Sequence, residues 1–343
     1  MTQIGGRRNM PDVSPLAAAA GGTPLMVLLA VLALTLVLSF VPSAARLYPQ
    51  FSGIRRLFAT VERRLNRESR SEANRIIRGA VVALLAALAA AALGWGLWRL
   101  ALTVPFGIGA EIVVLFFALS QSGVLAAMAE AAAALQDDDL AAARTALGTV
   151  GAGDRGAGDG FGLARLAIEE GARGFLERFL APAFWYVLAG LPGVFVYGTS
   201  LALSGVLASR GTSAEGFGLA ARRFSDALDY LPARLAGVIL IVAGAFLPKA
   251  SPAAGAAVLR RHGKRYPGPN GGWLLAPMAG VLGLALGGPG GADSAGGAAG
   301  GWIGDGRARA NAVDVRRAIY LLAVGNLLVV VLAAVLLLVK LAP

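Results

Sequence analysis

The chain contains no cysteine and a single histidine, His262. Without cysteine there can be no disulfide, no thiolate nucleophile and no cysteine-ligated metal. One histidine excludes a multi-histidine metal site, and we interpret His262 as a loop residue rather than a catalyst. The acidic run at 137–139 is interpreted as a helix cap. No residue is therefore assigned as a metal ligand.

Charged residues are also scarce, at 15% of the 343 residues, whereas soluble domains contain about 25%. Mean hydropathy is +0.67, and the apolar residues form long runs that a soluble core does not need. These features predict an all-α fold, a polytopic helical membrane protein with amphipathic cytoplasmic helices. The candidate spans are Thr23–Val41, Gly79–Val104, Ile108–Met128, Ala181–Ala208, Leu235–Leu247 (long enough only with its flanks) and Ile319–Leu341.

Basic residues dominate the charge, which is +11, and they gather in short loops beside the apolar runs. This pattern fits the positive-inside rule and anionic lipid headgroups better than nucleic acid. The segment Arg55–Arg78 holds eight arginines with apolar residues at helical spacing. It predicts an amphipathic helix on the cytoplasmic membrane surface, with the N-terminus outside. The expected location is the bacterial inner membrane, crossed several times.

The remaining segments predict how the chain is organised. Residues 1–22 are expected to be a disordered tail, and the Gly-rich stretch 287–301 a flexible loop without a P-loop motif. Leu163–Leu180 predicts an amphipathic helix, and Lys249–Arg265 a basic loop. Leu191-Pro192-Gly193 is expected to break or kink the fourth span. Trp273–Leu286 is expected to pack against other helices.

The stretch Arg222–Leu235 stands out because it places three arginines and two aspartates between two apolar runs. A charge that opens an apolar run is costly unless it is paired or reaches the interface. We therefore expect Arg234 to pair with Asp226 or Asp229. The alternative is an interfacial loop whose arginines extend to lipid headgroups.

Four groups of motifs resemble the CobD/CbiB family of cobalamin assembly. Arg223-Phe-Ser-Asp226-Ala-Leu-Asp229-Tyr-Leu-Pro232-Ala-Arg234 is similar to the family's Arg-x-Asp-Asp-x-x-Asn-x-x-Pro-Ala-Arg. The others are Pro269-Asn270-Gly-Gly-Trp273 with Met278-Ala-Gly-Val-Leu-Gly283, Gly287-Gly-Pro289 with Trp302-Ile-Gly-Asp-Gly306, and Ala181-Pro182 with Phe184-Trp-Tyr186, Gly190-Leu-Pro-Gly193 and Tyr197. The resemblance implies one membrane domain over residues 23–343.

The resemblance implies an adenosylcobinamide-phosphate synthase, which joins a corrinoid carboxyl to an aminopropanol-type amine by ATP-dependent amide formation. It implies ATP and Mg²⁺ as cofactors, a corrinoid ligand, and possible partner proteins of the cobalamin pathway. Such chemistry needs oxygen ligands for Mg²⁺, cations for phosphates and an acceptor for the amine proton. The acidic candidates are Glu169, Glu177, Asp226 and Asp305, and the substrate-binding candidates are Arg223, Arg234, Lys264, Asn270 and Trp273.

The chain also departs from the family at polar positions. Arg173-Gly174-Phe175-Leu176-Glu177-Arg178 stands where the family has Glu-Asn-Thr-x-Asp-Gly, and Leu275 replaces a glutamate. Residues 201–209 replace Asn-Thr-Leu-Asp-x-Met-Val-Gly-Tyr, and the family's early Gly-Asp-Pro and His-Pro-Val are absent from residues 41–53. These changes leave a second hypothesis open, a non-catalytic paralogue that acts as a corrinoid-binding protein or membrane scaffold.

Overall fold

A computed structural model describes residues 15–38, 52–66, 71–104, 107–119, 121–152, 158–208, 213–264, 268–288 and 301–342. The helices are α1 (Pro15–Leu38), α2 (Ser52–Leu65), α3 (Glu72–Thr103), α4 (Gly107–Ala118), α5 (Ser122–Gln136), α6 (Leu140–Gly148), α7 (Gly160–Phe175), α8 (Ala181–Ala208), α9 (Ser213–Ala243), α10 (Pro252–His262), α11 (Gly271–Leu282) and α12 (Ala312–Leu341). A π-helical turn, Leu176–Leu180, joins α7 to α8, and a 3₁₀ turn, Gly244–Phe246, follows α9.

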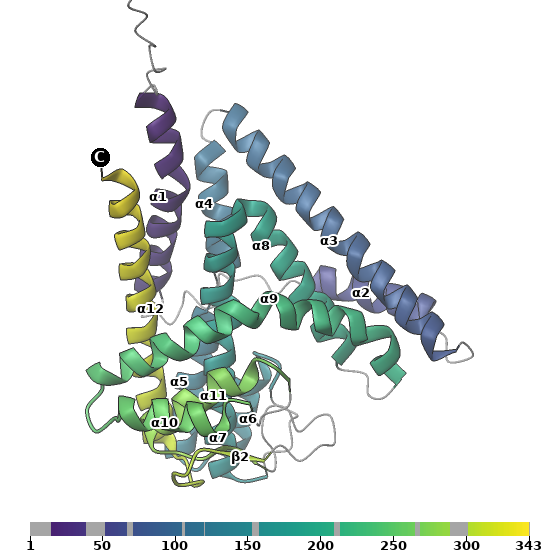
Figure 1. Cartoon of the computed structure of the whole chain (residues 1–343). Helices are drawn as coiled ribbons and strands as arrows, with labels where there is room; N and C mark the ends of the chain where they lie inside the picture. The colour runs from purple at the N-terminus through teal and green to yellow at the C-terminus, as the bar shows by residue number, and fades with distance from the viewer. Residues whose placement is uncertain are drawn as a thin grey trace, which may run out of the picture.

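The protein is an all-α, polytopic membrane protein. Five helical stretches of the described chain are long and apolar enough to cross a membrane: 72–103, 107–136, 160–206, 216–246 and 312–341. Figure 1 shows α1 and α12 side by side, with α3, α4 and α8 beyond them. The helices α5, α6, α7, α10 and α11 form the lower part, and α9 runs obliquely to α1 and α12.

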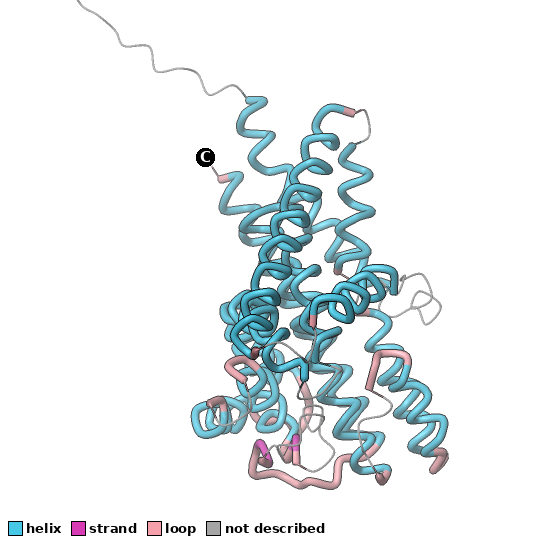
Figure 2. Tube along the Cα trace, turned by 90° about the vertical axis from the view of Figure 1, so that its right-hand side faces the viewer, coloured by secondary structure: helices cyan, strands magenta, loops and turns pink. Residues whose placement is uncertain are grey.

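The only sheet in the described part of the chain is a two-residue antiparallel pair, β1 (Leu286–Gly287) with β2 (Trp302–Ile303). Figure 2 shows this pair at the lower end of the molecule. Its register places Leu286 opposite Ile303, and both side chains are buried. The strand pair contacts α7 and α11 at this end of the molecule.

The last helix shows how local sequence sets a boundary. The Asn311 side chain accepts hydrogen bonds from the backbone N–H groups of Val313 and Asp314, and Asp314 accepts one from the Asn311 N–H. This reciprocal capping box satisfies N–H groups that have no partner within the helix. Asp314 is fully buried and also pairs with Arg307. The apolar residues of α12 follow this charged start.

Two predicted boundaries are confirmed. The Asp139 carboxylate caps α6 by accepting the Ala142 N–H at 2.9 Å, as expected for the acidic run. The expected break in Ala181–Ala208 occurs at Gly190, whose φ of 61° and ψ of −152° interrupt α8. Trp273–Leu286 also packs inside the protein as expected, because nearly all of α11 is buried.

Other predictions of secondary structure are corrected. Arg55–Arg78 is not one helix, because α2 ends at Leu65 and α3 begins at Glu72. Ile108–Met128 lies within the candidate span 107–136 as predicted, although α4 ends at Ala118 and α5 begins at Ser122. Lys249–Arg265 is largely the helix α10, because Ser251 caps it and Pro252 starts its first turn. Leu163–Leu180 is helical as predicted, but its end is a π-helical turn and most of its residues are buried.

The two segments with predicted disorder are described only in part. Helix α1 begins at Pro15, inside the tail 1–22, and residues 1–14 lie outside the described residues. Residues 289–300 of the Gly-rich stretch 287–301 also lie outside them. The first candidate span, Thr23–Val41, corresponds to the last two thirds of α1, from Thr23 to Leu38.

Close packing of α3 on α8 depends on Gly94. A methyl group added at Gly94 would lie 2.7 Å from Cα of Pro192, so the two backbones meet without a side chain between them. Small residues allow this approach in membrane helices. Gly96, two residues further along α3, has no atom within 4 Å of the same added group.

We therefore expect Gly94→Ala to lower stability by about 1–3 kcal/mol, because the helices must move apart. Gly96→Ala is the matched control and should be neutral or slightly stabilising, because alanine is the better helix former. Thermal unfolding of the two variants in detergent measures the difference. Equal melting temperatures would contradict the proposed contact.

Candidate functional site

The site is built from the middle of α9, where polar side chains face the interior. Asp226 and Asp229 are three residues apart and therefore share a face of the helix. Asp229 is buried and its Oδ1 accepts a hydrogen bond from the Tyr197 hydroxyl at 2.8 Å. Tyr197 itself is buried in α8. The α8–α9 contact thus fixes the orientation of one carboxylate.

The π-helical turn brings a third carboxylate to this point. Glu177 and Asp226 both lie close enough to Asp229 to interact with it electrostatically, and Arg173 opposes their negative charge. Since a π-helical turn adds a residue to the helical repeat, it changes the direction of the following side chains. The turn Leu176–Leu180 occurs where α7 passes into α8. Its position therefore directs Glu177 toward α9.

Arginines and an amide complete the arrangement. Arg222 and Arg223 interact electrostatically with Asp226, and both are exposed. The Asn270 Nδ2 donates to the backbone carbonyl of Asp226 at 2.7 Å, and Asn270 is buried. The start of α11 is therefore attached to the middle of α9 at the acidic residues.

Arg234 is not paired with Asp226 or Asp229, so that prediction is wrong. Its guanidinium donates to the backbone carbonyl of Tyr230 and to Asn270 Oδ1. It also lies 3.3 Å from the Tyr230 ring centroid and 4.9 Å from that of Trp273. Aromatic faces and oxygens satisfy this cation in place of a carboxylate.

We call these side chains the α9 cluster: Arg173, Glu177, Tyr197, Arg222, Arg223, Asp226, Asp229, Arg234, Asn270 and Trp273. It unites six of the nine residues predicted from sequence, Glu177, Arg223, Asp226, Arg234, Asn270 and Trp273. The sequence analysis did not assign Arg173, Arg222, Tyr197 and Asp229 to the site. Asp229 could have been found, because it follows Asp226 by one helical turn.

Three predicted residues have other surroundings. Glu169 is buried and accepts the backbone N–H of Gly287 at 2.7 Å, which ties α7 to β1. Asp305 is half exposed and pairs with Arg261 at 2.6 Å, with His262 at 3.6 Å. Lys264 is exposed just after α10. Their role in catalysis or binding remains a prediction.

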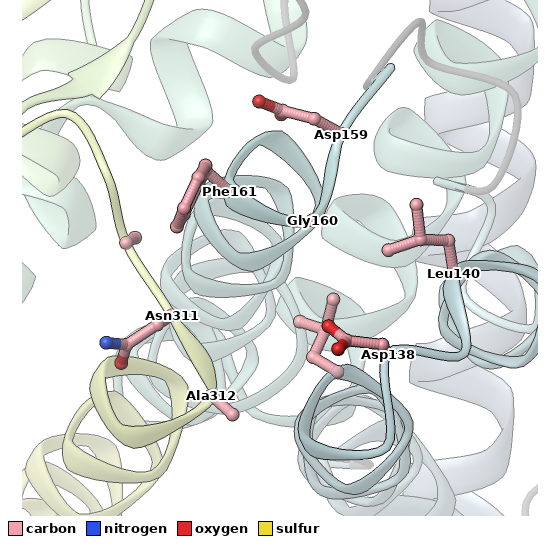
Figure 3. A pocket seen from close by; sticks show the side chains of 9 residues that line it. Asp138, Leu140, Asp159, Gly160, Phe161, Asn311 and Ala312 are labelled. Carbon is pink, nitrogen blue, oxygen red and sulfur yellow. The ribbon is translucent and has the colours of Figure 1, made fainter.

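Two cavities lie away from the α9 cluster. The larger, of about 320 Å³, lies between the α5–α6 turn and the starts of α7 and α12. Figure 3 shows Asp138, Asp159, Phe161 and Asn311 around it. The second, of about 190 Å³, is lined by α3, α4 and α8 and includes Glu111, whose Oε1 accepts from the Tyr186 hydroxyl. Neither contains a residue predicted for the site.

A family model described as CobD/Cbib protein matches residues 20–322, which include the whole α9 cluster. The chain belongs to this family. Three relatives are each named cobalamin biosynthesis protein CobD. That of Sinorhizobium sp is 36% identical over 230 residues (66% of this chain, 71% of the relative), and that of Rhizobium meliloti (strain 1021) is 35% identical over 233 (67% and 71%). The Rhodobacter capsulatus protein is 34% identical over 239 residues (69% and 73%). No solved structure matches the chain.

The stacking of Arg234 generates a prediction about stability. Arg234→Lys keeps the charge but loses the planar group between Tyr230 and Trp273, so we expect the protein to lose about 1–2 kcal/mol. Thermal unfolding measures the loss. Arg260→Lys, at an exposed position of α10, is the control. If Arg234→Lys melts with the wild type, the aromatic contacts do not stabilise the fold.

Proposed function

We propose that this chain acts in cobalamin biosynthesis as a membrane-bound ligase that forms an amide between a corrinoid carboxyl and an aminopropanol-type amine. Its family membership supports the pathway. The observation that supports amide formation is that Glu177, Asp226 and Asp229 lie close together beside exposed arginines. Carboxylates that can accept a proton and cations that can face phosphate are the groups this reaction needs.

The described residues could hold Mg²⁺ only together with the phosphates of ATP. Among the described residues, no group of three or more His, Cys, Asp or Glu side chains could hold a metal ion alone. Mg²⁺ is usually held by one or two carboxylates together with substrate phosphates. Asp226 and Asp229 would supply the carboxylates, and Arg222 and Arg223 would face the phosphates. When bound, Mg²⁺-ATP supplies the activation of the carboxyl group.

The chain's own residues have separable roles in this proposal. Tyr197 fixes the orientation of Asp229 through its hydroxyl. Glu177 lies close to Asp229 and accepts the proton that the amine releases when the amide bond forms. Arg234, held by Tyr230 and Trp273, is preorganised to bind a carboxylate or amide oxygen of the corrinoid periphery. Asn270 connects the start of α11 to the acidic residues of α9 through its hydrogen bond to the Asp226 carbonyl.

A second candidate function, a corrinoid-binding protein without catalysis, is favoured by two positions. Gly174 stands at a family amide position, and a methyl group there would lie 3.0 Å from the Val124 side chain. Leu275 stands at a family glutamate position and is buried among apolar residues. Both positions now belong to the hydrophobic core, so they cannot contribute polar groups to a reaction.

Complementation of a strain without its own synthase tests the proposal. We expect the chain to restore cobalamin formation from adenosylcobyric acid, which still has the free carboxyl, above the empty-vector level. Added cobinamide already contains the amide and serves as the positive control. The rate should fall below that of a family member with Glu-Asn-Thr-x-Asp-Gly, because each lost polar group can be worth on the order of 10²–10³ in rate. Glu177→Gln should abolish the conversion, and Glu130→Gln, at an exposed position of α5, should not.

Protein levels are compared by immunoblot in every strain. No conversion at normal expression would reject the ligase. In that case, titration of the purified protein with a corrinoid decides between the two functions. Binding that is lost in Arg234→Ala would support the non-catalytic paralogue, while no binding would reject both.

A further inference from the structure

Polar side chains without a hydrogen-bond partner among the described residues lie at the start of α5, inside the bundle. Gln121 is 2% exposed, and neither its Oε1 nor its Nε2 has a hydrogen-bond partner among the described residues. The neighbouring Ser122 hydroxyl is buried and likewise has none there. Gln121 also makes no side-chain cap bond to the first turn of α5. Four N–H groups at a helix start have no partner within the helix.

A third polar side chain belongs to the same level of the bundle. Asn326 of α12 is 1% exposed, and its Oδ1 has no partner in the described part of the chain. The helices α5, α7 and α12 all pack on one another. Their contacts at the glycines of α7 and α12 show which turns face each other.

The first contact pair relates α5 to α7. Gly174 faces Val124, and Gly171 faces Met128, so the two helices run antiparallel. One turn before Val124 is Gln121. One turn after Gly174 is the π-helical turn Leu176–Leu180. Gln121 and Ser122 therefore lie near the level of this turn.

The second pair relates α12 to α7. Leu322 of α12 faces Gly171 of α7. A methyl group added at Gly325 would lie 3.3 Å from the Phe175 ring, so α12 and α7 run parallel. Asn326 follows Gly325 and is also near the level of the π-helical turn. The polar groups on α5 and α12 thus lie near the level of the turn that carries Glu177, on two helices that contact each other.

We propose that Gln121, Ser122 and Asn326 bind ordered water at the start of α5, forming a hydrated site near the level of the π-helical turn. Buried polar groups without protein partners are commonly satisfied by water, at two to four hydrogen bonds per molecule. The ligand is neutral because no charged side chain belongs to the set, and water is the smallest molecule that both donates and accepts.

The absence of cysteine from the chain makes a direct test possible. In the purified full-length protein, Ser122→Cys introduces a single thiol at the proposed site. The control is Ala127→Cys, at a position in α5 that is 2% exposed. Both are treated with 2-aminoethyl methanethiosulfonate, and the mass shift of the intact protein is followed with time.

We expect Ser122→Cys to be modified on the order of tenfold faster than Ala127→Cys, because the thiolate reacts and a thiol in apolar surroundings does not ionise. Because the reagent is larger than water, a second variant decides if both thiols react slowly. Asn326→Leu should lower the melting temperature by about 2 °C or more if it displaces bound water.

An unchanged or higher melting temperature for Asn326→Leu, together with equal labelling rates, would overturn the proposal. Replacing an unsatisfied buried amide in a dry site by an apolar group of similar shape is neutral or stabilising. Neither measurement uses the proposed ligase activity. A dry site therefore leaves the proposed function standing, and a failed complementation leaves the hydrated site standing.

Discussion

The structure depends on the need to satisfy charged groups of α9 inside an apolar bundle. Asp229 is buried in a helix whose second half is almost entirely apolar. An isolated charge in such surroundings costs several kcal/mol, so each group must have a partner within the protein. Tyr197 from α8, Asn270 before α11 and the π-helical turn after α7 all supply polar groups here. The partners of one helix thus define how four elements meet.

The polar contacts of α9 also require the backbones of neighbouring helices to approach it closely. A methyl group at Gly237 would lie 2.6 Å from the Trp273 carbonyl oxygen, so α11 packs directly on α9. This contact holds Trp273 where Arg234 can stack on it. On the other side, Gly79 of α3 lies against the backbone of Phe217. Small residues therefore set the distances that the polar contacts need.

The sequence was most informative where one physical signal dominated. Apolar runs predicted the long helices, and the 137–139 run and Pro192 predicted a cap and a kink that the structure contains. It was least informative where charge and burial conflict. Leu163–Leu180 has the charge pattern of a surface helix, yet the partners of Glu169 and Glu177 lie far away in the chain, so local periodicity could not reveal them.

Arg234 is another residue whose partners could not be predicted from the sequence. Charge pairing predicted a carboxylate partner, because opposite charges are the simplest way to satisfy a buried cation. The actual partners are two aromatic rings and an amide oxygen. One ring lies one turn away in α9, but Asn270 and Trp273 come from a different helix start. Only the packing of α11 on α9 makes this solution available.

Comparison with the family motifs shows a rearrangement of acidic groups rather than a simple loss. Ser225 stands at a motif aspartate and Asp229 at a motif asparagine, so one carboxylate disappears and another appears one turn further along α9. Glu177 likewise stands at the aspartate of the altered Arg173–Arg178 stretch. Because Asp226, Asp229 and Glu177 interact in the folded protein, the α9 cluster retains three carboxylates despite these substitutions. A chain that had only lost catalytic groups would have no physical reason to keep three neighbouring carboxylates, of which Asp229 is buried, because their desolvation lowers stability. The retained charge is therefore the strongest argument that the α9 cluster binds or transforms a ligand.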